Sequence, residues 1–425
     1  MKNLLDKIFF RSNNLDFVSK KIKDIILTTP VDQIFDAINS YSLESEIRYV
    51  GGCIRKIINN ESIDDIDLAT NLNPNQVCEA LEKKNINYYK TGIEHGTVTA
   101  LVDEFKFEIT SLREDVFTDG RHAKVKFSKN WKMDASRRDF TINSIYSDNS
   151  GNLFDPFDGK KDLENGTIKF IGEADKRIKE DYLRILRYLR FFLSYSRQPH
   201  NAEIIKILKI NIGGVSKLSK ERLLDELKKM MKLEMLTKLS RDKISKEIIQ
   251  IIFPEIKKID IFSKLTTENK IKLSEKFDFI FMLSLLIIDE TDNAEYFLYK
   301  FNISKNDKKR IKKIDNFFKK KINSQTFTVS NLNKVFYYDG KQAVLDILNF
   351  QIVKAKKYDE NLKDLFKFYS QKTKPKLPIG ADILMTKYNM SEGKQLGIKL
   401  KMIEEEWVKN NFKISDQQVD NIINN

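Results

Sequence analysis

Glycine and proline are distributed unevenly along this chain, and their distribution constrains the fold more than any other feature. Only 15 of the 425 residues are glycine and 7 are proline, and most of the glycines lie between Gly51 and Gly214. Beyond Gly214 both residue types are sparse until the segment Pro375–Gly380. Because glycine and proline end helices and make turns, the pattern predicts a mixed α/β front half and a mostly helical rear.

The spacing of apolar residues in the front half supports this division. Arg48–Val50 reads as a short strand, and Asp65–Leu68 alternates polar and apolar residues as a half-buried strand does. Thr97–Val102 and Phe105–Thr110 are predicted to be two strands joined by the tight turn Asp103–Glu104.

Farther along the chain, apolar residues recur at helical spacing. The segment 305–321 places isoleucine and phenylalanine on one face and lysine on the other. The run Phe279–Ile288 is too short to span a bilayer and predicts a buried helix. Segment 371–380 is the best linker candidate. Two further helical series are Ile178, Tyr182, Ile185 and Leu189, and Leu396, Leu400, Ile403 and Trp407.

The chain is strongly basic, with 75 Lys and Arg against 61 Asp and Glu, a net charge of +14 and a pI of about 9.3. This excess favours a polyanionic partner, most commonly RNA or DNA, although a lysine-rich composition can also occur without one. The two cysteines, Cys53 and Cys78, form no CxxC pair, which argues against zinc and disulfide frameworks. We expect no membrane segment.

A pair of aspartates is the strongest chemical signal in the sequence. Asp64–Leu68 follows the segment Val50–Arg55, and residues two apart on a strand face the same way. Asp65 and Asp67 would therefore project together and share a divalent metal ion such as Mg²⁺, which binds through a few carboxylates and substrate phosphates. An isolated pair of this kind is more often a solvated strand edge.

Three further features near these aspartates fit phosphate chemistry. Gly51 and Gly52 would let backbone N–H groups approach a phosphate, and Arg55 would add a charged contact. Glu108 is the candidate third carboxylate, because Phe107 and Ile109 on either side would face the core. For each feature the plain alternative is a turn or a solvent-facing residue.

Five more motifs follow in a fixed order, and together they narrow the interpretation. They are Gly92–Val98, Arg113–His122, Arg137–Asn143, Asp155–Gly159 and Glu180–Arg187. In this order, from about Arg48 to Leu227, the chain resembles the class II tRNA nucleotidyltransferases, which are the CCA-adding enzymes, and the related bacterial poly(A) polymerases. Both belong to the nucleotidyltransferase superfamily of the DNA polymerase β type.

The resemblance implies an α+β fold, with a small mixed or antiparallel-sheet head followed by an all-α neck, body and tail. It implies addition of CCA to the 3′ end of tRNA from CTP and ATP, with two Mg²⁺ ions held by Asp65 and Asp67, assisted by Glu108. The expected division is residues 1–28 (an N-terminal helical segment), 29–172 (catalytic head), 173–230 (neck), 231–370 (body) and 371–425 (tail).

The resemblance also assigns nucleotide-binding residues in the last motifs. Arg137 and Arg138 would grip phosphates, with Arg187 also at the nucleotide. Asp139 and Asn143, taken as one helical turn apart on one face, would bond sugar hydroxyls.

Asp181 and Arg184, taken as i and i+3 on one helix, would select the base. A carboxylate only accepts hydrogen bonds and a guanidinium only donates them. Cytosine and adenine each place an amino donor beside a ring-nitrogen acceptor, whereas guanine and uracil reverse that order. A pair of Asp and Arg should therefore accept C and A and reject G and U. An ordinary surface ion pair is the plain alternative.

The family's flexible loop, which is thought to help the site switch from CTP to ATP, corresponds to Arg113, Asp115, Gly120, Arg121 and His122. Its apparent full length favours addition of the complete CCA. One departure from the family pattern is Lys56, where Asp or Asn is usual, and this places extra positive charge near the triphosphate.

The helical rear is expected to hold the tRNA acceptor arm through lysines that read backbone shape. A solvated helix face is an equally good interpretation of the densest cluster. That cluster is Lys305, Lys308, Lys309, Arg310, Lys312, Lys313 and Lys319 to Lys321.

Several alternatives remain open at this point. The chain could be a poly(A) polymerase, an enzyme that adds only CC or only A, or a catalytically idle RNA-binding protein. The composition suggests a bacterial, cytoplasmic protein, with an organellar home as the alternative. Either a monomer or a homodimer is compatible with the sequence.

Overall fold

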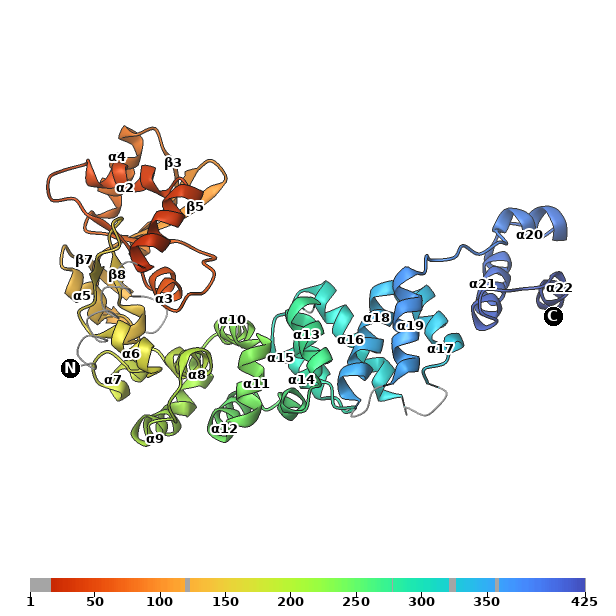
Figure 1. Cartoon of the computed structure of the whole chain (residues 1–425). Coiled ribbons are helices and arrows are strands. Elements are labelled where there is room, and N and C mark those ends of the chain that lie inside the picture. Colours follow the sequence, from red (N-terminus) through yellow and green to blue (C-terminus); the bar gives the residue numbers. More distant parts are fainter. Residues whose placement is uncertain (1–16, 119–122, 277, 321–325, 356–358, 425) are drawn as a thin grey trace. The chain divides into compact units, whose positions relative to one another are not determined.

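The computed structural model describes residues 17–118, 123–276, 278–320, 326–355 and 359–424 (Figure 1). The chain divides into two compact units, Met1–Glu226 and Leu227–Asn425. The first unit contains every strand of the described chain and the second is helical, so the predicted α+β fold is confirmed. Within the described segments, no helix combines the length and the apolar character that crossing a membrane would require.

A seven-stranded mixed sheet organises the first unit, in the order β3-β4-β5-β2-β1-β8-β9. β2 and β5 pair in parallel, and the other neighbouring pairs are antiparallel. A separate hairpin is formed by β6 (Arg113–Thr118) and β7 (Ala123–Phe127). The strands of the sheet are β1 (Ile47–Val50), β2 (Asp67–Thr70), β3 (Asn87–Gly92), β4 (Thr97–Val102), β5 (Phe105–Ser111), β8 (Tyr146–Ser147) and β9 (Leu153–Phe154).

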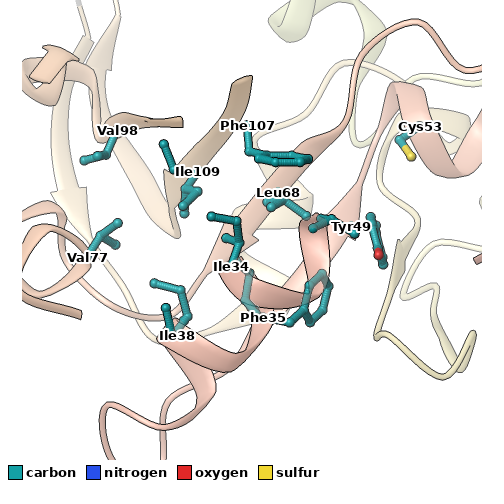
Figure 2. Packing of buried hydrophobic residues seen from close by; sticks show 14 of the residues in the cluster. Ile34, Phe35, Ile38, Tyr49, Cys53, Leu68, Val77, Val98, Phe107 and Ile109 are labelled. Atoms are coloured by element: carbon teal, nitrogen blue, oxygen red, sulfur yellow. The ribbon is translucent and has the colours of Figure 1, made fainter. Parts of the chain in front are cut away.

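The head core lies between the sheet and its covering helices. Figure 2 shows Ile34 and Phe35 of α2 (Val31–Asn39) packed beside Leu68 and Phe107 of the sheet. Along β5 the buried Phe107 and Ile109 alternate with more exposed residues, so one face of β5 packs in the core and the other faces the site. In β2, Leu68, Ala69 and Thr70 are all buried and only Asp67 is partly exposed. The other helices of the head are α3 (Gly52–Ile58), α4 (Pro74–Lys83), α5 (Trp131–Ser136) and α6 (Gly159–Asn165), and residues 17–28 are also helical.

Helices α7 (Ala174–Glu180) and α8 (Leu183–Tyr195) follow the sheet and are interrupted at Asp181, whose backbone is extended. The apolar series beginning at Ile178 therefore belongs to two helices and not to one. The ring of Tyr182, which follows the interruption, packs against Gly214, where a Cβ would lie only 2.1 Å from the ring. Helices α9 (Ala202–Asn211) and α10 (Lys220–Met230) complete this region.

The second unit is entirely helical in its described part. The predicted buried helix is α14, in which every residue from Ile280 to Ile287 is buried, and the predicted amphipathic helix is α21. No helix is assigned from 372 to 380, where the linker was expected. Its helices are α11 (Leu233–Arg241), α12 (Lys243–Ile252), α13 (Thr267–Lys276), α14 (Phe279–Ile287), α15 (Asn293–Lys300), α16 (Lys305–Lys319), α17 (Val329–Asp339), α18 (Lys341–Lys354), α19 (Glu360–Gln371), α20 (Ala381–Tyr388), α21 (Lys394–Lys409) and α22 (Asp416–Asn424).

Candidate active site

Two cavities meet at the catalytic face of the sheet. The first, of about 750 Å³, is lined by the arginines of several motifs. The second, of about 690 Å³, is lined by Asp65 and Glu108 together with part of the helix 17–28. Asp67 lines both cavities. The predicted residues that line the first cavity are Gly51, Gly52, Arg55, Asp67, Arg113, Arg137, Arg138, Asp139, Asn143, Asp181, Arg184 and Arg187.

The three carboxylates reach the site from different local structures. Asp67 begins β2 and is in register with Glu108 on the parallel strand β5, so the two residues are direct neighbours. Phe107 and Ile109 are buried, as predicted, and Glu108 is exposed. Asp65 precedes the strand, in residues 61–66 without helix or strand. The prediction that a strand carries both aspartates is therefore wrong, because the ladder with β5 starts only at Asp67.

Asp67 is the more buried member of the aspartate pair. Burial raises the pKa of its carboxyl and the charge of Asp65 raises it further, while Arg138 acts in the opposite direction. The charges of Asp65 and Asp67 thus interact although the two residues do not share a strand. A Cβ at Gly52 would lie 3.6 Å from Oδ2 of Asp67, so a glycine keeps the space beside this carboxylate open.

The donor set suits a hard divalent cation that the substrate helps to bind. Asp67 and Glu108 supply neighbouring carboxylates, and Asp65 opens into the same second cavity. Within the described residues, no group of three or more His, Cys, Asp or Glu side chains is gathered closely enough to form a ready metal cluster. Mg²⁺ is typically bound by one or two carboxylates plus phosphate oxygens and water, so these residues fit an ion that is completed by a nucleotide.

Arg137 and Arg138 are held by a buried acid that the sequence did not single out. Asp134, which is 1% exposed, accepts hydrogen bonds from Nε of Arg137 at 2.8 Å and Nη2 of Arg138 at 3.3 Å. Tyr146 also donates to Asp134 at 2.7 Å, and Nε of Arg138 donates to Tyr146 at 3.0 Å. Burial raises the pKa of Asp134, but the two guanidinium groups outweigh it and lower the pKa below its ordinary value.

Gly51 allows the close approach of Arg138 to the first cavity. Its φ is +63°, and a Cβ at this position would lie 3.2 Å from Nη1 of Arg138. The N–H of Gly51 donates to the carbonyl of Ile145 at 3.2 Å. This N–H is therefore already used, contrary to the prediction that it faces a phosphate.

Asp139 and Asn143 come together, although not on a helix. Asp139 lies in a bend and Asn143 ends the short 3-10 helix Thr141–Asn143, so the prediction that one helical face carries both is wrong. Nδ2 of Asn143 donates to Oδ1 of Asp139 at 2.8 Å, and Nε of Arg187 donates to Oδ2 at 2.6 Å. Arg55, which is buried, donates to the Asn143 side-chain oxygen. Burial raises the pKa of Asp139, but Arg187 and Asn143 together lower it to about 2.

Asp181 and Arg184 line the same cavity but contact different partners. Oδ2 of Asp181 pairs with Arg222 at 2.8 Å, and its Oδ1 accepts the backbone N–H of Leu183. Arg184 donates to Glu180 at 2.6 Å. The prediction of one continuous helix is wrong here, because Asp181 is extended between α7 and α8.

The predicted loop is described only in part. Arg113 begins β6, lines the first cavity and donates to the carbonyl of His95. Asp115 lies on β6 as well. Gly120, Arg121 and His122 lie outside the described residues.

Sequence reasoning missed several residues that hold the cavity wall. Arg190 lines the first cavity and donates to Glu226, which is 2% exposed, at 2.7 Å. Arg177 bridges Glu180 and the carbonyl of Arg138, the latter at 2.7 Å. Arg190 is i+3 from Arg187 on α8, and that spacing was a usable signal. Nothing in the sequence indicated that Glu226, 39 residues after Arg187, would reach both arginines.

Two family models match the chain. A model described as the Poly A polymerase head domain matches residues 47–169, and one described as tRNA nucleotidyltransferase domain 2, putative, matches residues 271–419. The first match contains all three carboxylates of the site, and the second lies within the helical rear.

Curated relatives match over most of the chain. It is 34% identical over 391 residues to the mitochondrial CCA tRNA nucleotidyltransferase 1 of Homo sapiens, covering 88% of this chain and 85% of the relative. It is 31% identical over 321 residues to the CCA-adding enzyme of Staphylococcus haemolyticus, covering 75% of each chain.

Solved structures share the fold at lower identity. The CCA-adding enzyme of Bacillus stearothermophilus in complex with CTP is 19% identical, with a TM-score of 0.69 over 90% of this chain and 93% of that one. The CCA-adding enzyme of Thermotoga maritima complexed with tRNA is 17% identical, with a TM-score of 0.59 over 92% and 94%.

Proposed function

This chain belongs to the CCA tRNA nucleotidyltransferase family, and from that premise we propose that it adds C, C and A in turn to the 3′ end of tRNA, using CTP and ATP. The 3′-hydroxyl oxygen forms a bond to the α-phosphorus of the nucleotide. The bond from that phosphorus to the bridging oxygen of the β-phosphate breaks, and pyrophosphate leaves. The hydroxyl proton passes to solvent.

The position of Asp67 in the wall of both cavities carries this proposal. Seven arginines and four carboxylates line the first cavity, a net charge of +3 that suits a triphosphate. The second cavity presents carboxylates, which suits the reacting hydroxyl and its metal ions. Phosphoryl transfer requires the attacking and leaving oxygens to lie on opposite sides of the phosphorus, and we infer that the nucleotide enters the first cavity and the tRNA 3′-hydroxyl the second.

Enzymes of this family use divalent metal ions. We propose two Mg²⁺ ions here, held by Asp65 and Asp67 with Glu108 assisting. Bound ions of this kind lower the pKa of an attacking hydroxyl and neutralise the triphosphate. The contribution of the chain is to present the carboxylates at the junction of the cavities.

Asp181 and Arg184 are proposed to select the base. Each oxygen of Asp181 accepts one hydrogen bond from the described residues and keeps a second lone pair, and the hydrogen bonds of Arg184 to those residues use only its Nη1. Both side chains therefore retain the donors and acceptors that cytosine and adenine require. A base of reversed polarity would leave a buried donor or acceptor unpaired, which costs about 1–3 kcal/mol.

Part of the basic cluster on α16 is neutralised inside the second unit. Arg310 pairs with Asp346 at 2.7 Å, Lys313 pairs with Asp339 at 3.5 Å, and Lys319 contacts three acids, so these cations are poor candidates for RNA contact. Lys321 lies outside the described residues. The cluster thus divides into an internally paired part and an exposed part.

We infer that the exposed part binds the tRNA backbone. Lys305, Lys309 and Lys312, here called the α16 lysine row, are all exposed and recur at i, i+4 and i+7, which places them on one face of the helix. None of the three pairs with an acid of the described residues within 4 Å.

We also infer that residues 173–230 form the neck, which contacts the base of the incoming nucleotide. Residues 231–370 and 371–425 are inferred to form the body and the tail, which bind the tRNA.

The sequence of the reaction product tests the function. Purified protein incubated with CTP, ATP and a tRNA lacking its last three nucleotides is expected to yield tRNA ending in CCA. The match of residues 47–169 to a Poly A polymerase head favours a second candidate, a poly(A) polymerase. Long A tails without C would establish that candidate and refute CCA addition, and a product ending in CC would identify a partial enzyme.

A further inference from the structure

Of the three candidate metal ligands Asp65, Asp67 and Glu108, Asp65 is the one whose position is not fixed by a strand. Asp67 and Glu108 belong to paired strands, whose hydrogen-bond ladder sets their spacing. Asp65 lies in residues 61–66, which have no helix or strand, and is exposed. Its place beside Asp67 must therefore come from contacts that hold this segment.

Lys56 on α3 contacts that segment at two points. Its carbonyl oxygen accepts the backbone N–H of Glu61 at 2.9 Å, where the segment begins. Its ammonium group pairs with Oδ2 of Asp64 at 2.6 Å, one residue before Asp65. The Lys56 side chain is 20% exposed and that of Asp64 is 65% exposed, so the lysine is the more enclosed partner.

The same ion pair distinguishes Asp64, whose charge is neutralised by Lys56, from the two aspartates that would bind the metal ion. Asp64, Asp65 and Asp67 all line the second cavity within four positions of sequence. Without the Lys56 charge, Asp64 would compete more strongly for cations with the other two and would repel them. Lys56 neutralises Asp64 and leaves Asp65 and Asp67 to face an ion together.

We propose that Lys56 is a positioning residue for the metal site, which holds the 61–66 segment through Asp64 and thereby sets the affinity of Asp65 and Asp67 for a divalent ion. This inference rests on the proposed function, because it assumes that these two aspartates bind metal. Lys56 stands where the family that the sequence resembles usually has Asp or Asn.

If Lys56 positions Asp65, its removal should change the affinity for a divalent ion in the opposite direction to that expected from its charge alone. A positive charge near a metal site repels the ion, so loss of that charge alone strengthens metal binding. Loss of a tether loosens Asp65 and weakens binding. The substitution Lys56→Met therefore separates the two effects by the sign of the change.

The test is Mn²⁺ binding to the full chain without nucleotide or tRNA, measured by electron paramagnetic resonance. An exposed ion pair contributes up to about 1 kcal/mol, so we expect Lys56→Met to weaken Mn²⁺ affinity by about two- to fivefold. Lys56→Arg is expected to stay near the wild type. The double variant Lys56→Asp with Asp64→Lys restores the ion pair with exchanged charges. It is therefore expected to bind Mn²⁺ more tightly than Lys56→Met does.

Lys84→Met is the matched control, because Lys84 forms a similar ion pair with Asp36 at 2.7 Å, and neither residue lines either cavity. Unchanged or tighter Mn²⁺ binding by Lys56→Met would overturn the inference. Addition of CCA by the wild type is scored separately. Normal addition together with unchanged Mn²⁺ binding by Lys56→Met refutes only the role of Lys56, whereas no addition by the wild type refutes the proposed function.

Discussion

Asp139 is predicted to stabilise the head through its charge, and Asp139→Asn should remove that stabilisation. The carboxylate is 8% exposed and accepts hydrogen bonds from Arg187 at 2.6 Å and Asn143 at 2.8 Å. Its pKa falls from the ordinary 3.8 to about 2 in the folded protein. A difference of that size corresponds to about 2 kcal/mol of folding free energy at neutral pH.

The sign of the pH dependence follows from the direction of this shift. A carboxyl whose pKa is lowered on folding contributes its full stabilisation above the unfolded value near pH 4, and loses it as the pH falls toward 2. We therefore expect Asp139→Asn to lower the free energy of unfolding by about 2 kcal/mol at pH 7, and by clearly less near pH 3.

Two tryptophans make the measurement specific to the head. Trp131 lies against Tyr146 in the head, with ring centroids 5.4 Å apart, whereas Trp407 is buried in the second unit. In a Trp407→Phe background, urea unfolding followed by fluorescence reports on the surroundings of Trp131. Asp103→Asn, in the exposed turn between β4 and β5, is the control and should leave the transition unchanged. A loss below about 0.5 kcal/mol at pH 7, or an equal loss at both pH values, would refute the reasoning.

The remaining predictions concern catalysis, packing and RNA binding. Asp67→Ala should abolish nucleotide addition while tRNA binding in a filter assay stays within about twofold, and retained activity would remove Asp67 from the mechanism. Gly214→Ala should destabilise the first unit by about 1–3 kcal/mol in thermal unfolding, because a Cβ would lie 2.1 Å from the Tyr182 ring; an unchanged transition would contradict that packing. Replacing the α16 lysine row with glutamine should weaken tRNA binding and flatten its salt dependence by up to about three units of slope, whereas Lys313→Gln should not; equal effects would contradict the division of the cluster.

Local pattern predicted much of the fold. Short apolar segments beside turns identified β1, β4 and β5, an unbroken apolar run identified α14, and helical spacing identified α21, because each pattern reflects how a single element is buried. The sparse glycine and proline of the rear correctly indicated helices. The order of the motifs identified the family, which the comparisons with known proteins confirm.

The sequence predicted which residues line the candidate site more successfully than it predicted the secondary structure on which they lie. The arginines of four motifs line one cavity, although Arg55 and Arg184 are 129 positions apart in the sequence. The strand was expected to begin two residues earlier than Asp67, and Asp181 was expected inside a helix. Such boundaries depend on tertiary contacts, here the ladder with β5 and the packing of Tyr182 on Gly214, which no local pattern encodes.

By itself, the sequence determined which residue types were available to the site and which elements would carry most of them. Only the tertiary structure decided the partners of several charges: Glu226 for Arg190, Arg222 for Asp181 and Asp64 for Lys56. The reason is physical. Burial periodicity is a property of one helix or strand, whereas an ion pair forms between whichever side chains the packing of separate elements brings within about 4 Å.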